Sequence, residues 1–363
     1  MKFNKLILAA LVSTLFFVSC TNDDTNNNYV PKGNYDSGVL VMNEGNFGTD
    51  NASVSYISFD LNSYENIDFS VINPGEVIGN TGQSIAFNGN LAYIVVNVSN
   101  KIEIVNRYTL KKVGAITAGL NKPRYMAFAN GKGYVTNWNS GTGAGTVAII
   151  DLGSNLVTAT IPVSDFPNKI IENAGKLYVA HNDLGQGGNS ITVIDPSTNT
   201  VNATIAVGDM PDAMAVDGTT LWVSCQGKSS YPIAADESAG KIVKVNLNSN
   251  TVTQTFSLTN ATDHVAYFEV FGDYAFYVLN SKIYKFPLTA SALPITESFT
   301  PTADYIYGFG VKNNKIYVGD AKSFVTNGTV LVYSAGTFGP DSIGTLLATI
   351  PVGVAPNGFY FNQ

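Results

Sequence analysis

The sequence predicts an all-β protein folded as a seven-bladed β-propeller, closed by pairing of its N- and C-terminal strands. Three observations lead to this prediction. One strand phrase recurs along the chain, its copies lie about one propeller blade apart, and the two ends of the structured part supply different pieces of one repeat. A β-helix or a sandwich is the structural alternative, but neither architecture needs complementary partial repeats at its ends.

The recurring phrase is an apolar strand that contains an aromatic residue, in most copies followed by valine. Its copies are residues 91–96 (LAYIVV), 131–137 (GKGYVTN), 175–181 (GKLYVAH), 218–224 (GTTLWVS), 274–279 (YAFYVL) and 314–320 (NKIYVGD). The aromatic residues stand at positions 93, 134, 178, 222, 277 and 317, so the spacings are 41, 44, 44, 55 and 40 residues. This period is close to the length of a four-stranded propeller blade.

Each repeat also contains the other strands of a blade. A Pro-led strand such as residues 123–129 (PRYMAFA) precedes the aromatic strand, and a polar loop follows it. Next come an alternating strand such as residues 190–195 (SITVID), a Ser/Thr/Asn turn, and a second alternating strand such as residues 200–206 (TVNATIA). Alternation of apolar and polar residues is typical of half-buried strands.

The two chain ends predict how the ring closes. Residues 38–44 (GVLVMNE) match the aromatic strand but have no strand before them, whereas residues 355–361 (APNGFYF) match the Pro-led strand but have no strand after them. Six complete blades and one shared blade make seven. Closure of the ring removes the open strand edges that a linear array of sheets would expose.

The first 37 residues predict a signal peptide and a tether. Residues 1–19 contain Lys2, Lys5 and an apolar run that is too short for a stable membrane span. Residues 17–20 (FVSC) resemble a bacterial lipobox, which implies cleavage before Cys20 and acylation of its thiol. The polar residues 20–37 then form a flexible tether to the propeller of residues 38–363. An ordinary secretory signal with an incidental cysteine is the alternative.

Composition and charge exclude several function classes. With 45% apolar and 13% charged residues, the chain can build a large core and is not disordered. Its net charge of −7, without a Lys/Arg cluster, is wrong for binding nucleic acid or an anionic membrane surface. Cys225 stands in an apolar run and is expected to be a buried small side chain, with no disulfide partner once Cys20 carries lipid.

With these phrases identified, residues 38–363 resemble the YncE-like family of seven-bladed propellers. Residues 41–48 (VMNEGNFG), followed by residues 52–56 (ASVSY), resemble the opening of surface lipoproteins of Bacteroidetes. Asp23 and Asp24 are similar to the signal that sends such proteins to the outer cell surface, which implies an outer-membrane location. Some members of the group capture cobalamin and hand it to a TonB-dependent outer-membrane transporter. The resemblance therefore implies a small-molecule nutrient ligand, with cobalamin as the concrete candidate, and a transporter as partner.

A binding site is expected where the loops between second and third strands, and between blades, meet around the channel. Amide and aromatic side chains in these loops suit a large, partly polar ligand. Arg124 and Lys169 occupy matching positions after the prolines of two blades, where cations facing the channel could receive an anion. The candidate residues are Asn46, Phe47, Arg124, Asn137, Trp138, Lys169, His181, Asn182, Asp183, Gln226, Tyr231, Asp320, Phe324 and Asn357.

Structural roles remain alternatives for these candidates. The ring of Trp138 can pack on the neighbouring blade, and Tyr231 and Phe324 can simply pack within their loops. His181 can be a hydrogen-bonded structural histidine. Arg124 and Lys169 can be solvated or paired with a carboxylate.

The leading hypothesis is a non-enzymatic, monomeric surface lipoprotein that binds a ligand and needs no cofactor. No Gly-x-Ser-x-Gly elbow or Walker phosphate loop occurs, and two histidines with one free cysteine make a poor transition-metal site. The first alternative is a calcium-dependent propeller hydrolase or lactonase. Its oxygen ligands would come from Glu44, Asp183, Asp209, Asp263 and Asp320. The second alternative is a surface-layer or adhesion protein.

Overall fold

The computed structural model describes residues 31–139, 145–182, 187–231, 233–337, 339 and 342–363. The chain divides into two compact units, Met1–Pro31 and Lys32–Gln363. All strands and buried clusters found in the described residues belong to the second unit, which therefore has a complete core of its own. The described part of the chain includes no helix with the length and apolar character that crossing a bilayer requires.

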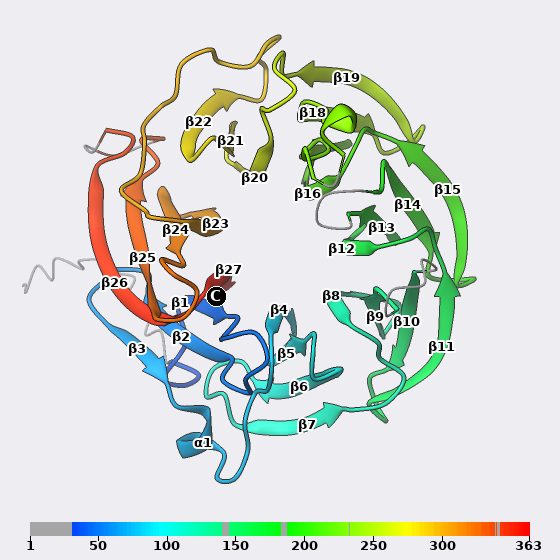
Figure 1. Cartoon of the computed structure of the whole chain (residues 1–363). Coiled ribbons are helices and arrows are strands. Elements are labelled where there is room, and N and C mark those ends of the chain that lie inside the picture. The colour runs from blue at the N-terminus through cyan, green and yellow to red at the C-terminus, as the bar shows by residue number, and fades with distance from the viewer. Residues whose placement is uncertain (1–30, 140–144, 183–186, 232, 338, 340–341) are drawn as a thin grey trace, which may run out of the picture. The chain divides into compact units, whose positions relative to one another are not determined.

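Within Lys32–Gln363, the described strands form seven antiparallel sheets around a ring (Figure 1). From the channel outward, the first sheet contains β27 (Pro356–Asn362), β1 (Gly38–Asn43), β2 (Ser53–Ser58) and β3 (Tyr64–Ile67), and the second contains β4 (Gly82–Asn88), β5 (Leu91–Val96), β6 (Lys101–Asn106) and β7 (Lys112–Ile116). The third contains β8 (Pro123–Ala129), β9 (Lys132–Asn137), β10 (Thr146–Asp151) and β11 (Leu156–Pro162), and the fourth contains β12 (Pro167–Asn173), β13 (Lys176–His181), β14 (Ser190–Asp195) and β15 (Thr200–Ala206).

The remaining sheets follow the same order. The fifth contains β16 (Pro211–Asp217), β17 (Thr220–Cys225), β18 (Lys241–Asn246) and β19 (Thr251–Ser257), and the sixth contains β20 (Val265–Phe271), β21 (Tyr274–Leu279) and β22 (Lys282–Pro287). The seventh contains β23 (Ile306–Lys312), β24 (Lys315–Asp320), β25 (Asn327–Ser334) and β26 (Leu346–Val354). The short helix α1 (Phe69–Ile72) follows β3, and the 3₁₀ helix η1 (Ala234–Asp236) lies between β17 and β18. The all-β, seven-bladed prediction is confirmed.

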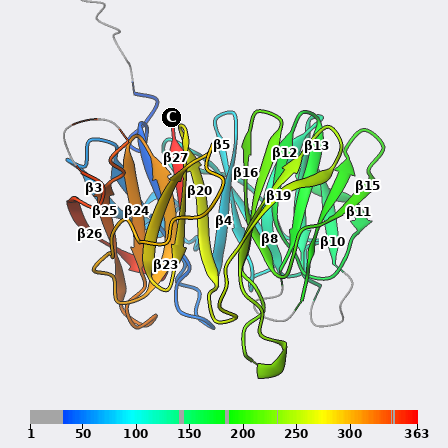
Figure 2. The same ribbon diagram turned by 90° about the horizontal axis from the view of Figure 1, so that it is seen from above.

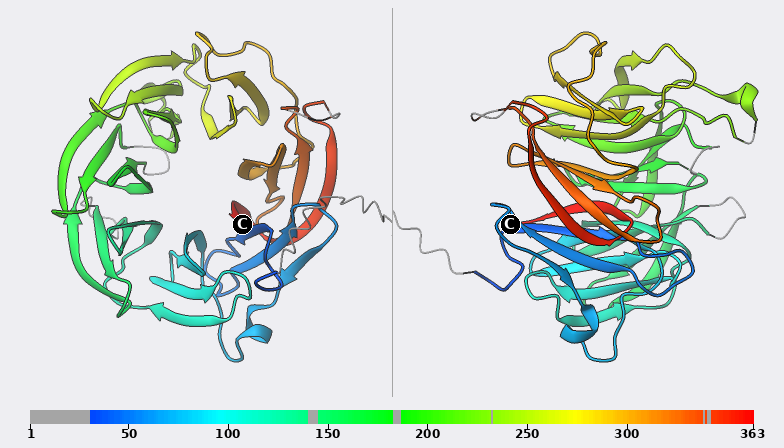
Figure 3. Two further views of the ribbon diagram at one scale, coloured as in Figure 1. Left: turned by 180° about the vertical axis from the view of Figure 1, so that it is seen from behind. Right: turned by 60° about the vertical axis from the view of Figure 1, so that its left-hand side comes forward.

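The shared first blade closes the ring as the sequence predicts. β1 pairs with β27 in antiparallel register, from Gly38 opposite Asn362 to Asn43 opposite Pro356. In Figure 3 the red C-terminal strand lies beside the blue N-terminal strand. At the end of β27, the Asn362 side-chain amide donates to the carbonyl of Tyr35 at 2.6 Å and to that of Arg107 at 2.9 Å. The C-terminal strand is therefore fixed both by the sheet and by the two segments beside it.

The sixth sheet departs from the predicted set of complete blades, because its described part has three strands. After β22, an isolated bridge between Ile283 and Phe299 takes the place of an outer strand. The connecting segment contains Pro294 and Pro301, which cannot donate to a strand ladder. The prediction of six complete four-stranded blades is therefore wrong for this blade.

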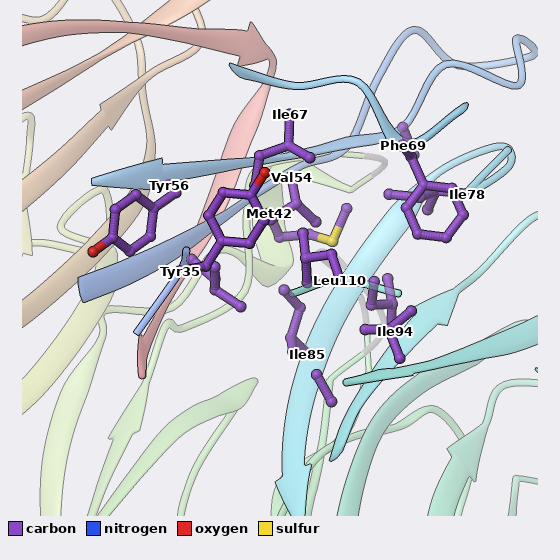
Figure 4. Packing of buried hydrophobic residues seen from close by; sticks show 14 of the residues in the cluster. Tyr35, Met42, Val54, Tyr56, Ile67, Phe69, Ile78, Ile85, Ile94 and Leu110 are labelled. Carbon is purple, nitrogen blue, oxygen red and sulfur yellow. The ribbon is translucent and has the colours of Figure 1, made fainter. Parts of the chain in front are cut away.

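The hydrophobic core lies between neighbouring sheets. The aromatic residues of the recurring phrase, from Tyr93 to Tyr317, are all at most 1% exposed. Five of them pack against the next blade, whereas Tyr277 packs toward the fifth blade and Phe276 faces the seventh. Figure 4 shows one such layer, in which Met42 and Val54 of the first blade meet Ile85 and Ile94 of the second. This packing makes the ring a rigid scaffold for the loops and strand ends at its faces.

A β-bulge at the start of each innermost strand determines which side chains face the channel. In β8, for example, Pro123 pairs with Asn137 but the next paired residue is Met126, so Arg124 and Tyr125 bulge out of register. The register shifts at the start of the other six innermost strands as well. A bulge re-aims side chains away from the sheet. One or two residues of every blade are thereby turned toward the central channel.

Candidate functional site

A cavity of about 650 Å³ occupies the central channel at the end where the innermost strands begin. These seven strands surround the opening in Figure 1. The bulged residues line the cavity, together with the loop residues Glu44, Gln226 and Tyr305. The opposite face of the ring carries the end of β27 and the first described residues of the second unit, since Asn362 bonds to Tyr35. Figure 2 shows the C-terminus at that face and the loop between β17 and β18 at the other.

A hydrogen-bonded arc of polar side chains crosses four neighbouring blades. Arg124 Nη1 donates to Gln83 Oε1, and Arg124 Nε donates to Asn168 Oδ1 at 3.0 Å. The Asn168 amide in turn donates to Asp212 Oδ1 at 3.3 Å, and Lys169 Nζ lies 3.4 Å from Asp212 Oδ2. Each blade therefore orients the polar group of the next, which keeps the arc in one arrangement.

The backbone beneath this arc is also held between blades. The Ser84 hydroxyl donates to the carbonyl of Arg124 at 2.7 Å, and the Thr136 hydroxyl donates to the carbonyl of Asn168 at 2.7 Å. In both cases a residue of one blade fixes the start of the innermost strand of the next blade. The positions of the arc residues are thus a consequence of blade packing.

Arg124 is the most deeply buried cation of the cavity. It is 9% exposed, and its guanidinium carbon lies 4.0 Å from the ring centroid of Trp138. Among the described residues no carboxylate lies within 4.0 Å of its nitrogen atoms. Burial lowers the pKa of Arg124 from its usual value, which the more distant charge of Glu44 partly opposes. The guanidinium is therefore a buried charge whose identified partners are two neutral amides and an aromatic face.

The first blade contributes a carboxyl group to the cavity wall. The hydroxyl of Tyr307 donates to Glu44 Oε2 at 2.5 Å, and the amide of Asn357 also stabilises the Glu44 carboxylate. Burial nevertheless raises the pKa of Glu44 above its usual value. Asn357 donates to the carbonyl of Gly82 at 2.9 Å, and its buried Oδ1 has no hydrogen-bond partner. The cavity wall thus contains a buried acceptor oxygen that no described residue satisfies.

Glu269 and Lys169 are charged side chains of the same channel, and their pKa values are both raised. For Lys169, burial lowers the pKa, but Asp212, Tyr125 and Glu269 outweigh that effect. Burial raises the pKa of Glu269 to about 7, although Lys169 acts in the opposite direction. Near neutral pH the cavity wall therefore contains a carboxyl group that is partly protonated.

When the pH is raised from 5 to 8, Glu269→Gln is expected to lose less stability than wild type. A carboxyl whose pKa is raised in the folded state contributes stability in acid, and this contribution is lost as the pH rises through about 7. From pH 5 to pH 8, we expect the free energy of unfolding to fall by roughly 1–3 kcal/mol more in wild type than in Glu269→Gln. Urea unfolding at the two pH values measures it. Glu172→Gln, at an exposed position, is the control, and equal losses in all three proteins would contradict the assignment.

Five of the predicted residues line the cavity, namely Arg124, Lys169, Asn182, Gln226 and Asn357. Trp138 lies directly behind Arg124, with its ring edge toward Phe166. One expectation is corrected. Arg124 and Lys169 are not equivalent, because the residue in the position of Arg124 after Pro167 is Asn168, and Lys169 follows it.

The other predicted residues lie away from the cavity wall. Asn137 and His181 are buried, and both ring nitrogens of His181 are hydrogen-bonded, to the Asp165 carbonyl and the Thr192 hydroxyl. Asp320 accepts hydrogen bonds from the backbone N–H groups of Tyr305 and Lys322. Asp183 lies outside the described residues.

The remaining loop residues lie at the rim or beyond it. The side chains of Phe47 and Tyr231 are 86% and 77% exposed. Asn46 donates to the carbonyl of Phe324 at 3.0 Å, and the ring of Phe324 packs edge-on against Tyr305 and Tyr307. Phe324 therefore supports two tyrosines that line the cavity.

Several cavity residues were absent from the sequence-based set, above all Gln83, Asn168, Asp212, Tyr267, Glu269 and Tyr307. The Pro-led strands contained the signal, because the residue after the proline is the one that the bulge turns inward. Gln83 and Tyr307 follow Gly82 and Ile306 instead of proline, so the pattern was hidden there.

The geometry does not favour the calcium alternative. The amide oxygens of Gln83 and Asn168 accept from Arg124, a cation that already occupies the position between them. Asp209 accepts from Ser238, and Asp263 accepts from Asn260 and Asn280. Across the described residues, no group of three or more His, Cys, Asp and Glu side chains could hold a metal ion.

The family model described as "Domain of unknown function (DUF5074)" matches residues 37–343, nearly the whole propeller. The chain belongs to the DUF5074 family. No curated protein matches the chain.

Solved structures share the fold of this DUF5074 chain at low identity. A quinonprotein alcohol dehydrogenase-like protein from Bacteroides thetaiotaomicron has a TM-score of 0.66 at 15% identity, over 92% of this chain and 80% of that chain. The periplasmic gluconolactonase of Pseudomonas aeruginosa has a TM-score of 0.65 at 12% identity, over 90% and 99%. Apo AztD from Citrobacter koseri has a TM-score of 0.50 at 13% identity, over 89% and 96%. At these identities the likeness shows the fold alone.

Proposed function

We propose that this protein is a cell-surface binding lipoprotein that holds a small nutrient molecule in its channel cavity and presents it to an outer-membrane transporter. The observation that carries the proposal is the cavity of about 650 Å³ whose wall is a fixed set of amides, tyrosines and charged groups. A pocket of this size with a few convergent polar groups is typical of a small-molecule site.

A binding role explains the arrangement of the polar groups that line the cavity better than a catalytic role does. The polar groups of the arc are hydrogen-bonded to one another, and none of those described forms a pair of nucleophile and base. Pre-organised groups of this kind favour affinity, because little side-chain entropy is lost when a ligand enters.

The position of the cavity within the propeller unit agrees with presentation of a ligand. The first described residues of the propeller unit lie at the face that carries Asn362, whereas the cavity opens at the other face. A transporter could then approach the bound ligand.

Cobalamin is the concrete ligand, as the resemblance to Bacteroidetes surface lipoproteins implies. Isothermal titration of the purified protein with cyanocobalamin tests it, with haem and a soluble oligosaccharide as other ligands. We expect saturable heat with the corrinoid and at least about tenfold weaker binding in Tyr305→Ala, which shortens a rim side chain of the cavity. Tyr231→Ala removes an exposed ring outside the cavity and should bind like wild type. Absence of heat with all three ligands would refute the proposal.

The anchor has its own test. Cys20→Ser should abolish acylation and release the protein from the membrane fraction, because the lipid is the proposed attachment. Sedimentation of membranes with immunodetection measures this, and radiolabelled fatty acid shows the acylation. A variant that still sediments like wild type would show that the attachment does not depend on Cys20.

A further inference from the structure

The starting observation is that Arg124 is a buried cation without a neighbouring anion. The residue is 9% exposed and lines the cavity, and in the described part of the chain no carboxylate oxygen lies within 4.0 Å of it. A buried charge costs several kcal/mol unless it is paired. Two neutral amides satisfy part of its hydrogen bonding but do not neutralise it.

The guanidinium is also held in one orientation with donors to spare. Nε donates to Asn168, Nη1 donates to Gln83, and the ring of Trp138 covers one face at 4.0 Å. A guanidinium carries five N–H donors. The described residues supply no acceptor for the others, so they remain for a molecule in the cavity.

The other cation of the arc does not need a ligand in the same way. Lys169 Nζ lies 3.4 Å from Asp212 Oδ2, so its charge is matched by the protein. The Glu44 carboxyl follows β1 in the first blade, where Tyr307 donates to it, and it acts on Arg124 only as a more distant charge. Arg124, unlike Lys169, therefore has no ion pair within 4.0 Å among the described residues.

We infer that Arg124 is the recognition site for a single oxyanion group of the ligand, a carboxylate or a phosphodiester with one negative charge. The guanidinium fork matches the geometry of such groups and binds them through paired N–H···O bonds. The inference rests on the proposed function, because it names the chemistry of the ligand that enters this cavity. It also explains why an unpaired arginine is held at the channel wall.

The test is isothermal titration of the purified protein with sodium acetate and, separately, with sodium dimethyl phosphate, in a buffer free of other oxyanions. Acetate represents a carboxylate, and dimethyl phosphate represents the phosphodiester that a corrinoid nucleotide carries. We expect saturable binding of at least one probe in the millimolar range. In Arg124→Gln this binding should weaken by about 10- to 100-fold, as expected for loss of a charged hydrogen-bonding partner.

Two further variants keep the test decisive. Arg124→Lys retains the charge but loses the paired N–H donors of the guanidinium, so its affinity should fall between those of wild type and Arg124→Gln. It replaces the glutamine variant in the test if that variant does not melt cooperatively. Lys322→Gln makes the same change of charge at an exposed position near Phe324 and should bind like wild type. Failure of wild type to bind either probe, or equal binding by wild type and both Arg124 variants, would overturn the inference.

The outcomes also separate the inference from the proposed ligand. Arg124-dependent binding of acetate without binding of cyanocobalamin would support the anion site and reject the corrinoid. Binding of cyanocobalamin that is unchanged in Arg124→Gln would support the proposed function and reject the anion site.

Discussion

Deletion of residues 356–363 is expected to leave a chain that does not fold cooperatively. The deletion removes β27, the innermost strand of the shared blade, and exposes the backbone of β1 as an open edge. It also removes Phe359 and Phe361, whose rings each lie 5.7 Å from the ring of buried Tyr317. We expect the loss to be comparable with the roughly 5–15 kcal/mol that stabilises a typical domain.

Circular dichroism during heating measures this prediction. Wild type should show one sharp transition, and the truncated chain should show none or should precipitate during expression. A protein that lacks only Gln363, an exposed residue outside β27, is the matched control and should melt like wild type. A truncated chain with the melting temperature of wild type would show that ring closure contributes little.

Trp222→Ala is expected to destabilise the protein by about 3–5 kcal/mol, the usual effect of removing a buried tryptophan. Trp222 is 1% exposed and stands in β17, where its ring lies about 6 Å from the rings of Phe256, Phe268 and Phe286. Lys244 Nζ covers the ring at 4.3 Å. The substitution therefore opens a cavity at the centre of the cluster between the fifth and sixth blades.

Urea unfolding at 25 °C measures the difference in free energy, and Trp222→Phe is the matched control. Phenylalanine keeps an aromatic ring in the cluster and removes the indole N–H, which is buried without a hydrogen-bond partner. We expect it to cost much less than alanine. Equal losses for the two substitutions would show that a phenyl ring cannot replace the indole in this cluster, and would contradict the expected gain from keeping an aromatic ring.

The fold was predictable because the same pattern occurs in each blade. Alternation and the aromatic–valine strand reflect burial between sheets, which repeats at every blade, and the complementary ends reflect closure. The three-stranded sixth sheet was not predicted, because the sequence between Pro287 and Ile306 still has the length of a strand and a turn. Only the prolines at positions 294 and 301 hint that no ladder forms.

The cavity was only partly predictable, for a local reason. Loop residues such as Trp138 and Tyr231 attract attention because they are large rings among polar residues, but exposure and packing depend on neighbours far away in the sequence. The bulges that turn Arg124, Asn168 and Asp212 inward shift the side-chain alternation of the strand at that point. A strand read with strict alternation therefore assigns these residues to the wrong face.

The central claim is that ligands enter the channel cavity beside Arg124, and the fluorescence of Trp138 tests it most directly. Trp138 lies against the Arg124 guanidinium, whereas the other tryptophan, Trp222, is buried between two other blades. Titration of wild type with acetate or dimethyl phosphate is expected to give a saturable change in tryptophan emission that is absent in Trp138→Phe. Saturable heat of binding without any change in emission, or the same change in Trp138→Phe, would place the ligand elsewhere and contradict the account.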